Sequence, residues 1–451
     1  MRSHHRVRLL KFAFCLALAC LAGCAVYHPA PLPPAPDLAA TPPLTVPASE
    51  FWLPGLKPHS FPKNGLDETA VVTLAVFDNP DLKTARLQEG VASAQLLQAG
   101  LLPDPVLSAD FAKSALNYGG GIGLSEDIQA LISRGAAKAA ARANERQVQL
   151  NILWQEWQVA ERARELFIQS QSNAQLQRVL ASARDFFAER YRQDQAALHR
   201  EDITISIATA DLTLLADAES KLRQFQLNAS ATCQQLDQLL GLQPGVQLQL
   251  TGPTAMQALP KAQFQAAVTA LPRRRADLLA LQAGYEAQQQ SLREAILAQF
   301  PDLSAGVTYS RDSVEGVNSF GPNVTLSLPL FNRNRGNIAI QRATRTVLRE
   351  AYQARLDQAV GSANQVWEAT KIMQKQLGDL DARLAVLRQT AAAAKQGFEQ
   401  ANVSAALYVT VESSLLTTEA EEIKLRGSLA TAQSSLNTLL GLPFGTGANT
   451  P

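Results

Sequence analysis

The 451-residue sequence repeats itself once, at a spacing close to 200 residues. Leu239-Leu240-Gly241-Leu242 returns as Leu439-Leu440-Gly441-Leu442. Further matches keep the same order at offsets between 196 and 201: Asp81-Leu82 with Asp277-Leu278, Pro103-Asp104 with Pro301-Asp302, Ser133-Arg134-Gly135 with Asn334-Arg335-Gly336, and Arg142-Ala143 with Arg342-Ala343. An ordered set of matches at nearly one offset indicates duplication. We therefore predict a first repeat over 65–245, a linker over 246–263 and a second repeat over 264–444.

Both repeats change their hydrophobic period in the same order. A first helix is expected over 65–101 and its counterpart over 261–299, and alternating residues follow each of them. Residues 136–199 then contain neither glycine nor proline, which allows up to ~95 Å of continuous helix. Returning helices are expected over 202–240 and 405–440. Helices this long do not suit a compact globule, so we predict a mainly α fold of long antiparallel helices with a small β part.

The returning helices carry a heptad-like apolar seam, which is typical of helices that pack side by side. The seams of the two repeats correspond at an offset of 200: Phe225, Ala229, Thr232, Leu236 and Leu239 match Leu425, Leu429, Ala432, Leu436 and Leu439. Gly241 and Gly441 follow these helices and are expected as their C′ residues, since glycine readily adopts the left-handed conformation that ends many helices.

Each repeat is expected to contain one pair of strands with an apolar and a polar face. In the second repeat, the apolar positions are Leu303, Ala305, Val307, Tyr309, Val324, Leu326 and Leu328. Asn323, Thr325 and Ser327 alternate with the last three and form the polar face. The first repeat shows the pattern more weakly, in Leu107, Ala109 and Phe111 and then in Ile122 and Leu124.

Four such strands cannot close a barrel, because known single-chain membrane barrels begin at eight strands. Open sheet edges are not tolerated in lipid, since their backbone groups would lack hydrogen-bond partners. If the strands lie in a membrane, several chains must share them, and three chains would give a twelve-stranded barrel. Val307, Tyr309, Val324, Leu326 and Leu328 would then face lipid. Asn323, Thr325 and Ser327 would line a wet lumen.

The N-terminus has the pattern of a secreted lipoprotein. A basic start and a short apolar run lead to Leu21-Ala22-Gly23-Cys24, which resembles a bacterial lipobox. We expect a signal peptide over 1–23, lipidation of Cys24 and a proline-rich tether over 24–64. The apolar run is too short to span a membrane. Of the four cysteines only Cys233 would remain free, so no intrachain disulfide is expected, and residues 445–451 are left as a tail.

Three segments of the second repeat resemble the TolC-type outer-membrane efflux proteins, as does the closing Leu-Leu-Gly-Leu. The segments are Asp277-Leu278-Leu279-Ala280-Leu281, Phe300-Pro301-Asp302-Leu303-Ser304 and Leu328-Pro329-Leu330-Phe331-Asn332-Arg333-Asn334-Arg335-Gly336. The last is most similar to the heavy-metal efflux (CzcC-like) branch of outer-membrane lipoproteins. The resemblance covers about residues 65–444 and is looser in the first strand pair.

The resemblance implies both an architecture and a function. The helices would form an α-barrel that continues a trimeric β-barrel into the periplasm. The homotrimer would dock on a periplasmic adaptor (membrane fusion) protein and an inner-membrane RND-type pump. The chain would be the passive exit duct of this system in the outer membrane, with heavy-metal cations as the cargo. Drugs or other small molecules are the alternative cargo.

Members of this family close the periplasmic end near the second helical turn, commonly with a Tyr-x-x-Gly-x-x-Ser stretch followed by acidic residues. The matching segment is Phe398-Glu399-Gln400-Ala401-Asn402-Val403-Ser404, in which Ala401 replaces the glycine. Leu407 and Thr410 stand where acidic residues are common. The candidate gate residues are therefore the acids that remain near the two turns: Asp194, Glu201, Asp202, Glu399 and Glu412.

Other activities lack support in the sequence. Lys+Arg 41 against Asp+Glu 40 gives a net charge of +1, without the basic footprint of a nucleic-acid binder. The glycine run at 119–123 is not followed by the residues of a phosphate loop, and the scattered histidines His28, His59 and His199 offer no metal-ligand spacing. We expect no cofactor and no enzymatic activity. A lipid-anchored periplasmic scaffold without a pore is the alternative of another class.

Overall fold

A computed structural model of the protein describes residues 27–43, 53, 65–113, 118–254, 258–312 and 317–443. Its contacts divide the chain into two units, residues 1–38 and residues 39–451. In the first unit, residues 27–38 contain neither helix nor strand. The predicted signal peptide, Cys24 and the tail over 445–451 lie outside the described residues, as does most of the predicted tether. The helices and strands of the described residues belong to the second unit.

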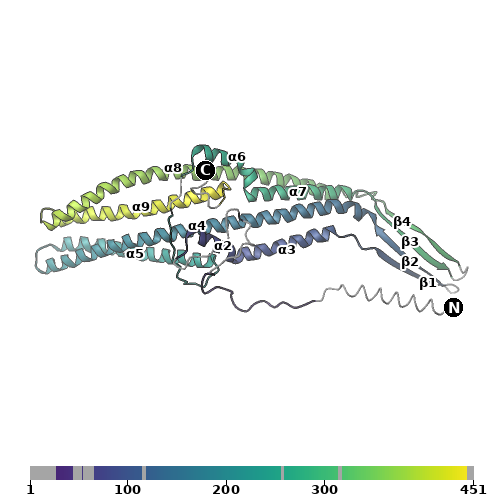
Figure 1. The fold of residues 1–451 in the computed structure, drawn as a ribbon, viewed down its shortest axis with the longest axis horizontal. Coiled ribbons are helices and arrows are strands. Elements are labelled where there is room, and N and C mark those ends of the chain that lie inside the picture. Colours follow the sequence, from purple (N-terminus) through teal and green to yellow (C-terminus); the bar gives the residue numbers. More distant parts are fainter. Residues whose placement is uncertain are drawn as a thin grey trace. The chain divides into compact units, whose positions relative to one another are not determined.

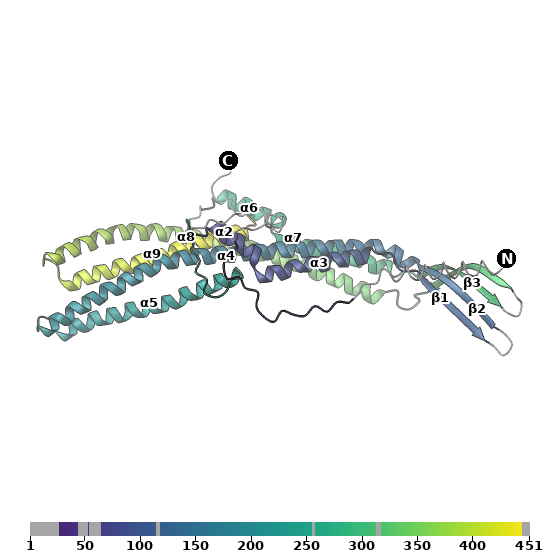
Figure 2. The same ribbon diagram turned by 60° about the horizontal axis from the view of Figure 1, so that its bottom comes forward.

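The elements of the second unit follow one order twice (Figure 1). The first series is α2 Glu68–Asp78, α3 Pro80–Gly100, β1 Val106–Lys113, β2 Tyr118–Asp127, α4 Ile128–His199 and α5 Ile205–Leu239. The second series is α6 Lys261–Arg274, α7 Ala276–Leu297, β3 Asp302–Asp312, β4 Asn318–Ser327, α8 Arg335–Glu399 and α9 Ala405–Leu439. The internal duplication and the mainly α fold are thus confirmed. The strands lie at one end of the long helices, and the α4–α5 and α8–α9 turns lie at the other (Figures 1 and 2).

The first helix of each repeat is broken, contrary to the prediction of continuous helices over 65–101 and 261–299. Asn79 separates α2 from α3, with ψ 123° before Pro80, because proline disfavours helical geometry in the residue that precedes it. Arg275 separates α6 from α7 with φ −74° and ψ 122°, three residues after Pro272. α4 is longer than expected and begins at Ile128, since Gly135 is accommodated inside the helix.

The two breaks hold the ends of the returning helices. The side-chain amide of Asn79 donates to the carbonyl of Leu239 at 3.1 Å, and Nη1 of Arg275 donates to the carbonyl of Leu439 at 3.3 Å. Gly241 has φ 65° and Gly441 has φ 64°, which confirms both as left-handed C′ residues. A Cβ on Gly241 would lie 2.9 Å from the carbonyl oxygen of Asp78, so glycine is also needed there for close approach.

The largest hydrophobic core surrounds α2, where residues 70–76 are all buried. A helix that is buried on every side is packed inside the fold rather than along its surface. Leu166, Phe167 and Ile168 of α4 and Leu240 complete this core. Smaller apolar clusters continue along the paired long helices, for example around Leu176 and Phe225. The helices are therefore joined by a series of local cores.

The four strands form one antiparallel sheet in the order β1-β2-β3-β4. β3 continues beyond Tyr309 to Asp312, and β4 begins before Asn323, at Asn318, so both strands are longer than the alternating positions suggested. Leu328, predicted as a strand residue, lies just beyond the end of β4.

No helix in the described part of the chain combines the length and the apolarity needed to cross a membrane.

Candidate functional site

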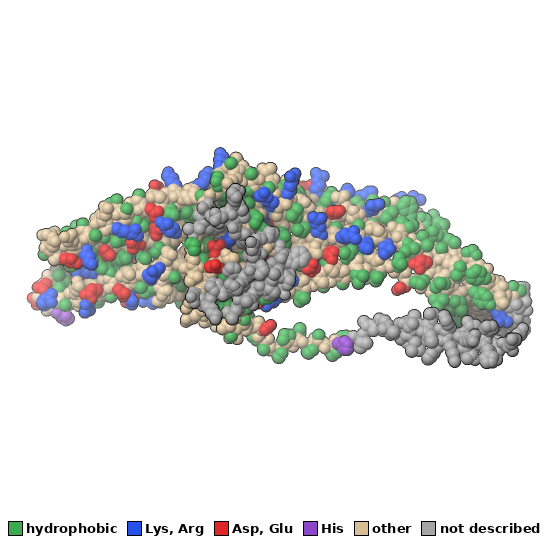
Figure 3. Space-filling model, in the orientation of Figure 1, with side chains coloured by type: hydrophobic (Ala, Val, Ile, Leu, Met, Phe, Trp, Pro, Cys, Tyr) green, Lys and Arg blue, Asp and Glu red, His purple; other side chains and the backbone are tan. Residues whose placement is uncertain are grey.

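The sheet carries large apolar side chains on one face. Residues that are directly paired across antiparallel strands lie on the same face. Leu107 pairs with Leu124, Leu124 with Val307, and Val307 with Pro322. The same face continues through Ala109, Phe111, Ile122, Leu303, Ala305, Tyr309, Phe320, Val324 and Leu326. Most of these large side chains are exposed, and hydrophobic side chains gather over this end of the molecule (Figure 3).

The opposite face consists mainly of small and polar residues. Asn323 pairs with Gly306, Thr325 with Ser304, and Ser327 with Asp302. The middle strands contribute Gly119, Gly121, Gly123, Ser125, Thr308 and Ser310. A Cβ on Gly306 would collide with the carbonyl oxygen of Leu124 and would lie 2.8 Å from Oδ1 of Asn323. The glycine run at 119–123 lies within β2, where a Cβ on Gly121 would lie 2.7 Å from Oδ1 of Asp110.

The sheet of one chain is open at both sides. β1 pairs only with β2 and β4 only with β3, as far as the described residues extend. Both outer strands are eight or more residues long and therefore present a row of unpaired backbone groups.

At the other end of the long helices, both turns use the same backbone geometry. The amide of Asp202 donates to Ala197 at 2.9 Å, and the amide of Asn402 donates to Gly397 at 2.8 Å. These are the hydrogen bonds of a Schellman motif, which needs a left-handed residue. Glu201, with φ 63°, and Ala401, with φ 57°, occupy that position. Ala401 thus has a conformation that glycine would adopt without strain.

A buried ion cluster lies about two helical turns away from the α4–α5 turn. Nη2 of Arg190 donates to Oδ1 of Asp194 at 2.8 Å, and its Nε lies 3.5 Å from Oδ2 of Asp211 on α5. All three side chains are buried. Burial, followed by the hydrogen bond and the charge of Asp211, raises the pKa of Asp194 to about 6, although Arg190 opposes the shift. Two carboxylates therefore share one guanidinium in a partly desolvated place.

Aromatic side chains connect this cluster to the second repeat. The guanidinium of Arg190 lies 5.7 Å from the ring centre of Phe398 on α8. Phe398 stacks on Tyr408 of α9 at 5.3 Å, and Tyr408 meets Phe186 of α4 edge to face at 5.5 Å. The pKa of Tyr408 is raised by burial and by the charges of Glu412 and Glu399. Four helices from the two repeats therefore meet at one mixed aromatic and ionic contact.

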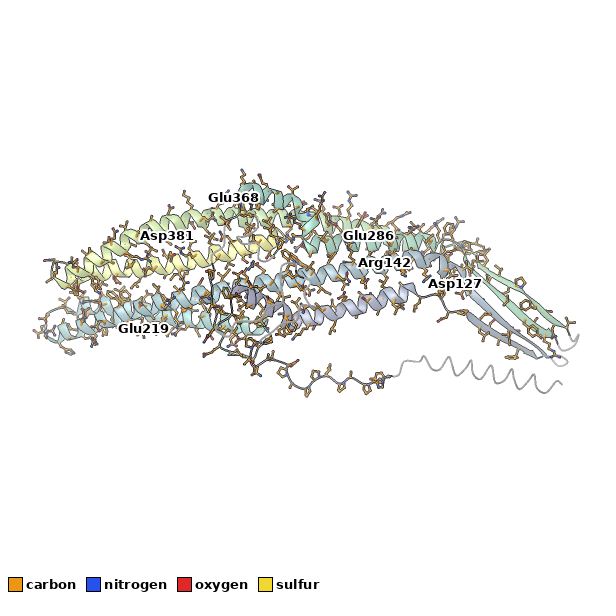
Figure 4. The ribbon with its side chains drawn as sticks, in the orientation of Figure 1. Asp127, Arg142, Glu219, Glu286, Glu368 and Asp381 are labelled. Carbon is orange, nitrogen blue, oxygen red and sulfur yellow. The ribbon has the colours of Figure 1, made fainter. Side chains whose placement is uncertain are left out.

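The five predicted gate residues do not form a single acidic site. Asp194 belongs to the buried cluster, whereas Asp202 makes an exposed ion pair with Arg200 at 2.8 Å. Glu201 and Glu399 are exposed near the turns. Glu412 is half-buried on α9, and burial raises its pKa. Elsewhere the labelled charged side chains are distributed along the helices, except Asp127 at the end of β2 (Figure 4).

Sequence reasoning missed Arg190, Asp211 and Tyr408. Two signals could have found them. Arg190 and Asp194 are four residues apart on a helix, a spacing that favours an ion pair. In an antiparallel hairpin, residues equally far from the turn lie opposite each other. Asp194 and Asp211 are equally far from the point between residues 202 and 203, and Phe398 and Tyr408 are equally far from Val403.

Within the described residues, no three His, Cys, Asp or Glu side chains are grouped to hold a metal ion.

Comparisons with known proteins identify similar folds. A family model described as outer membrane efflux protein matches residues 268–442. No curated protein sequence matches the chain. Among solved structures, CusC has 18% identity and a TM-score of 0.69, over 91% of this chain and 99% of its own. VceC from Vibrio cholerae has 17% identity and a TM-score of 0.68, over 84% and 96%. The open state of the MtrE outer membrane channel from Neisseria gonorrhoeae has 17% identity and a TM-score of 0.65, over 94% and 100%.

Proposed function

We propose that this chain, whose residues 268–442 belong to the outer membrane efflux protein family and whose fold is that of the TolC-type channels, is the outer-membrane exit duct of a tripartite efflux system. Transport through it would be passive and driven by a partner pump. The observation that carries the proposal is the open four-stranded sheet with one apolar and one polar face.

An open sheet of this kind supports assembly with other copies. Its free edges cannot remain unpaired in lipid, so the strands of several chains must join. Three chains supply twelve strands, an even number within the range of bacterial barrels. In that barrel Val307, Tyr309, Val324 and Leu326 face lipid, with Leu328 at the barrel's edge. Asn323, Thr325 and Ser327 line the lumen.

The long helices then extend the duct into the periplasm, where the α4–α5 and α8–α9 turns would meet a periplasmic adaptor protein and an inner-membrane RND-type pump. Lipidation of Cys24 would anchor each chain to the outer membrane. The gate of the duct would lie at the helical turns, where Asp194 is held by Arg190 and where Glu201, Asp202, Glu399 and Glu412 surround the turns.

The cargo is proposed to be heavy-metal cations, on the similarity of the Asn-Arg-Asn-Arg-Gly segment to the metal-efflux branch. A conduit needs no metal-ligating group, because it releases its cargo rather than holding it. Metal and drug sensitivities of a deletion strain test this assignment. Sensitivity to metal cations alone supports it, whereas sensitivity to drugs alone assigns the duct to multidrug efflux.

Planar-bilayer recording tests the duct itself. The purified, detergent-extracted protein is expected to insert as an oligomer and to conduct ions in discrete steps. A monomer that stays soluble in water after Cys24 is replaced, and that gives no conductance, would instead identify a periplasmic scaffold.

A further inference from the structure

Exposed apolar side chains mark all four junctions between the sheet and the helices. Leu101 and Leu102 follow α3, and Leu131 and Ile132 lie in the first turns of α4. Phe300 follows α7, and the β4–α8 junction exposes Leu328, Leu330 and Phe331. Phe331 is 96% exposed. The apolar surface of the sheet therefore continues to the level at which the helices begin (Figure 3).

The β4–α8 junction differs from the other three junctions in the charged residues that follow it. Residues 328–349, here named the junction patch, contain five arginines and no lysine, aspartate or glutamate. Arg333, Arg335 and Arg342 are exposed, and no carboxylate of the described residues lies within 4.0 Å of them. Arg335 and Arg342 are two helical turns apart, so they lie on the same side of α8, about 10 Å from each other. Blue side chains adjoin the apolar end of the molecule in Figure 3.

The junction is held in a strained corner that presents these side chains outwards. Arg333 has φ 45° and Asn334 has φ 52°, a conformation that non-glycine residues rarely adopt. The side-chain amide of Asn334 donates to the carbonyl of Ala295 at 2.8 Å, and the amide of Arg335 donates to Asn332 at 3.0 Å. Strain of this kind persists where the surroundings enforce it, and it is concentrated at functional positions. Phe331 and Arg333 are both exposed at this corner.

We propose that the junction patch binds the headgroups of anionic phospholipids at the periplasmic surface of the membrane. Leu330 and Phe331 enter the acyl region, and Arg333, Arg335 and Arg342 bind phosphate groups. Guanidinium groups match phosphate geometry and attract anionic surfaces, while exposed aromatic and apolar side chains suit the membrane interface. The inference rests on the proposed function, since it requires that the sheet lies in a membrane.

The test measures binding of phosphatidylglycerol and of phosphatidylethanolamine to the purified full-length protein in neutral detergent. Lipid retained on the protein is counted by native mass spectrometry, and affinity is obtained by titration with mixed micelles. The patch variant combines R333Q, R335Q and R342Q. Its matched control combines R273Q, R274Q and R383Q, three exposed arginines outside the patch that lose the same charge.

We expect the wild type to prefer phosphatidylglycerol, and the patch variant to bind it roughly 100-fold more weakly at low salt. The control should keep the wild-type preference. Replacing Phe331 with serine should weaken binding of both lipids by about tenfold, because the aromatic ring contributes by burial rather than by charge. The wild-type preference should also decline with added salt, which screens the arginines.

Three results would overturn the inference. The first is an equal affinity of the wild type for both lipids. The second is full competition by soluble glycerol phosphate together with no effect of Phe331→Ser, which would identify a simple anion site. The third is loss of oligomers in the patch variant, which would show that the patch contacts a second copy. Conductance separates this inference from the proposed function. A wild type that conducts but shows no lipid preference refutes only the lipid site. A protein that binds the lipid but never conducts refutes only the duct.

Discussion

Single residues set the geometry of the helical turns, and Ala401 is the clearest case. Its left-handed conformation costs a side chain with a Cβ about 1–2 kcal/mol, whereas glycine adopts it freely. We therefore expect Ala401→Gly to stabilise the folded protein by about 0.5–1 kcal/mol, after the larger chain entropy of glycine is included. The thermal unfolding midpoint, followed by circular dichroism in detergent, checks this.

Ala382 is the control for that substitution, since it is exposed in the middle of α8. Ala382→Gly should destabilise the protein by up to about 1 kcal/mol, as glycine does inside helices. Opposite signs at the two positions support the strained turn. Destabilisation at both would show that Ala401 is not strained in solution.

The buried cluster around Asp194 predicts a pH dependence of the helical turns. Because the pKa of Asp194 is raised from 3.8 to about 6, its contribution to stability is complete below about pH 3.8 and is lost as the pH rises through 6. Ionisation adds a second negative charge beside Asp211, with only Arg190 to balance both. We expect local opening near Asp194 to increase by on the order of tenfold between pH 5 and pH 7.

Hydrogen exchange of the peptides that contain Asp194 and Asp211 measures this opening. At each pH, the exchange rate of the wild type is divided by that of Asp194→Asn, and this ratio cancels the chemical dependence of exchange on pH. This ratio should be higher at pH 7 than at pH 5 by on the order of tenfold, since aspartate ionises in this range and asparagine does not. A ratio that is the same at both values would contradict the role of Asp194.

At the scale of elements, the two faces of β4 predict opposite effects of one substitution. Val324 lies on the apolar face, paired with Ala305, and Thr325 lies on the polar face, paired with Ser304. Val324→Arg should destabilise the inserted protein by ~2–4 kcal/mol per chain if it lies at the membrane midplane, and should reduce assembly. Thr325→Arg should preserve assembly and change the conductance. Gel analysis of oligomers and bilayer recording measure both, and equal damage from the two variants would refute the facing of the strand.

The elements themselves were largely predictable, because the hydrophobic period and the positions of glycine and proline are local signals. Alternation located all four strands, and the absence of glycine and proline located most of α4. The breaks at Asn79 and Arg275 were missed for different reasons. Pro80 was a visible signal for the break at Asn79. Arg275, in contrast, is extended while its side chain binds Asp277, two residues later, and the carbonyl of Leu439, which is distant in the sequence. The contact with Leu439 could not be read from the local sequence.

The candidate site was predictable only in part, because it depends on contacts between elements. The alternation of β4 separated Asn323, Thr325 and Ser327 from Val324 and Leu326, since the strand period alone decides this. The contact of Arg190 with Phe398 was not predictable, since it depends on how the hairpins of the two repeats pack.

At the scale of the whole molecule, duplication explains why one chain is incomplete. Each repeat supplies two strands and one helical hairpin, and the pairing of β2 with β3 joins the repeats into a single sheet. Two repeats still leave β1 and β4 as free edges. A closed barrel therefore requires the β1 edge of one copy to meet the β4 edge of another.

Cysteine cross-linking between those edges tests the shared barrel most directly. In a Cys233→Ser background, cysteines replace Leu107 or Ala109 in β1 together with Val324 or Leu326 in β4, so that all four pairings are covered. Within one chain these edges are three strand spacings apart, about 14 Å, which is beyond the reach of a disulfide. Oxidation in membranes is expected to give a ladder that ends at three chains for at least one pairing. Only single-chain bands at every pairing would contradict the shared barrel.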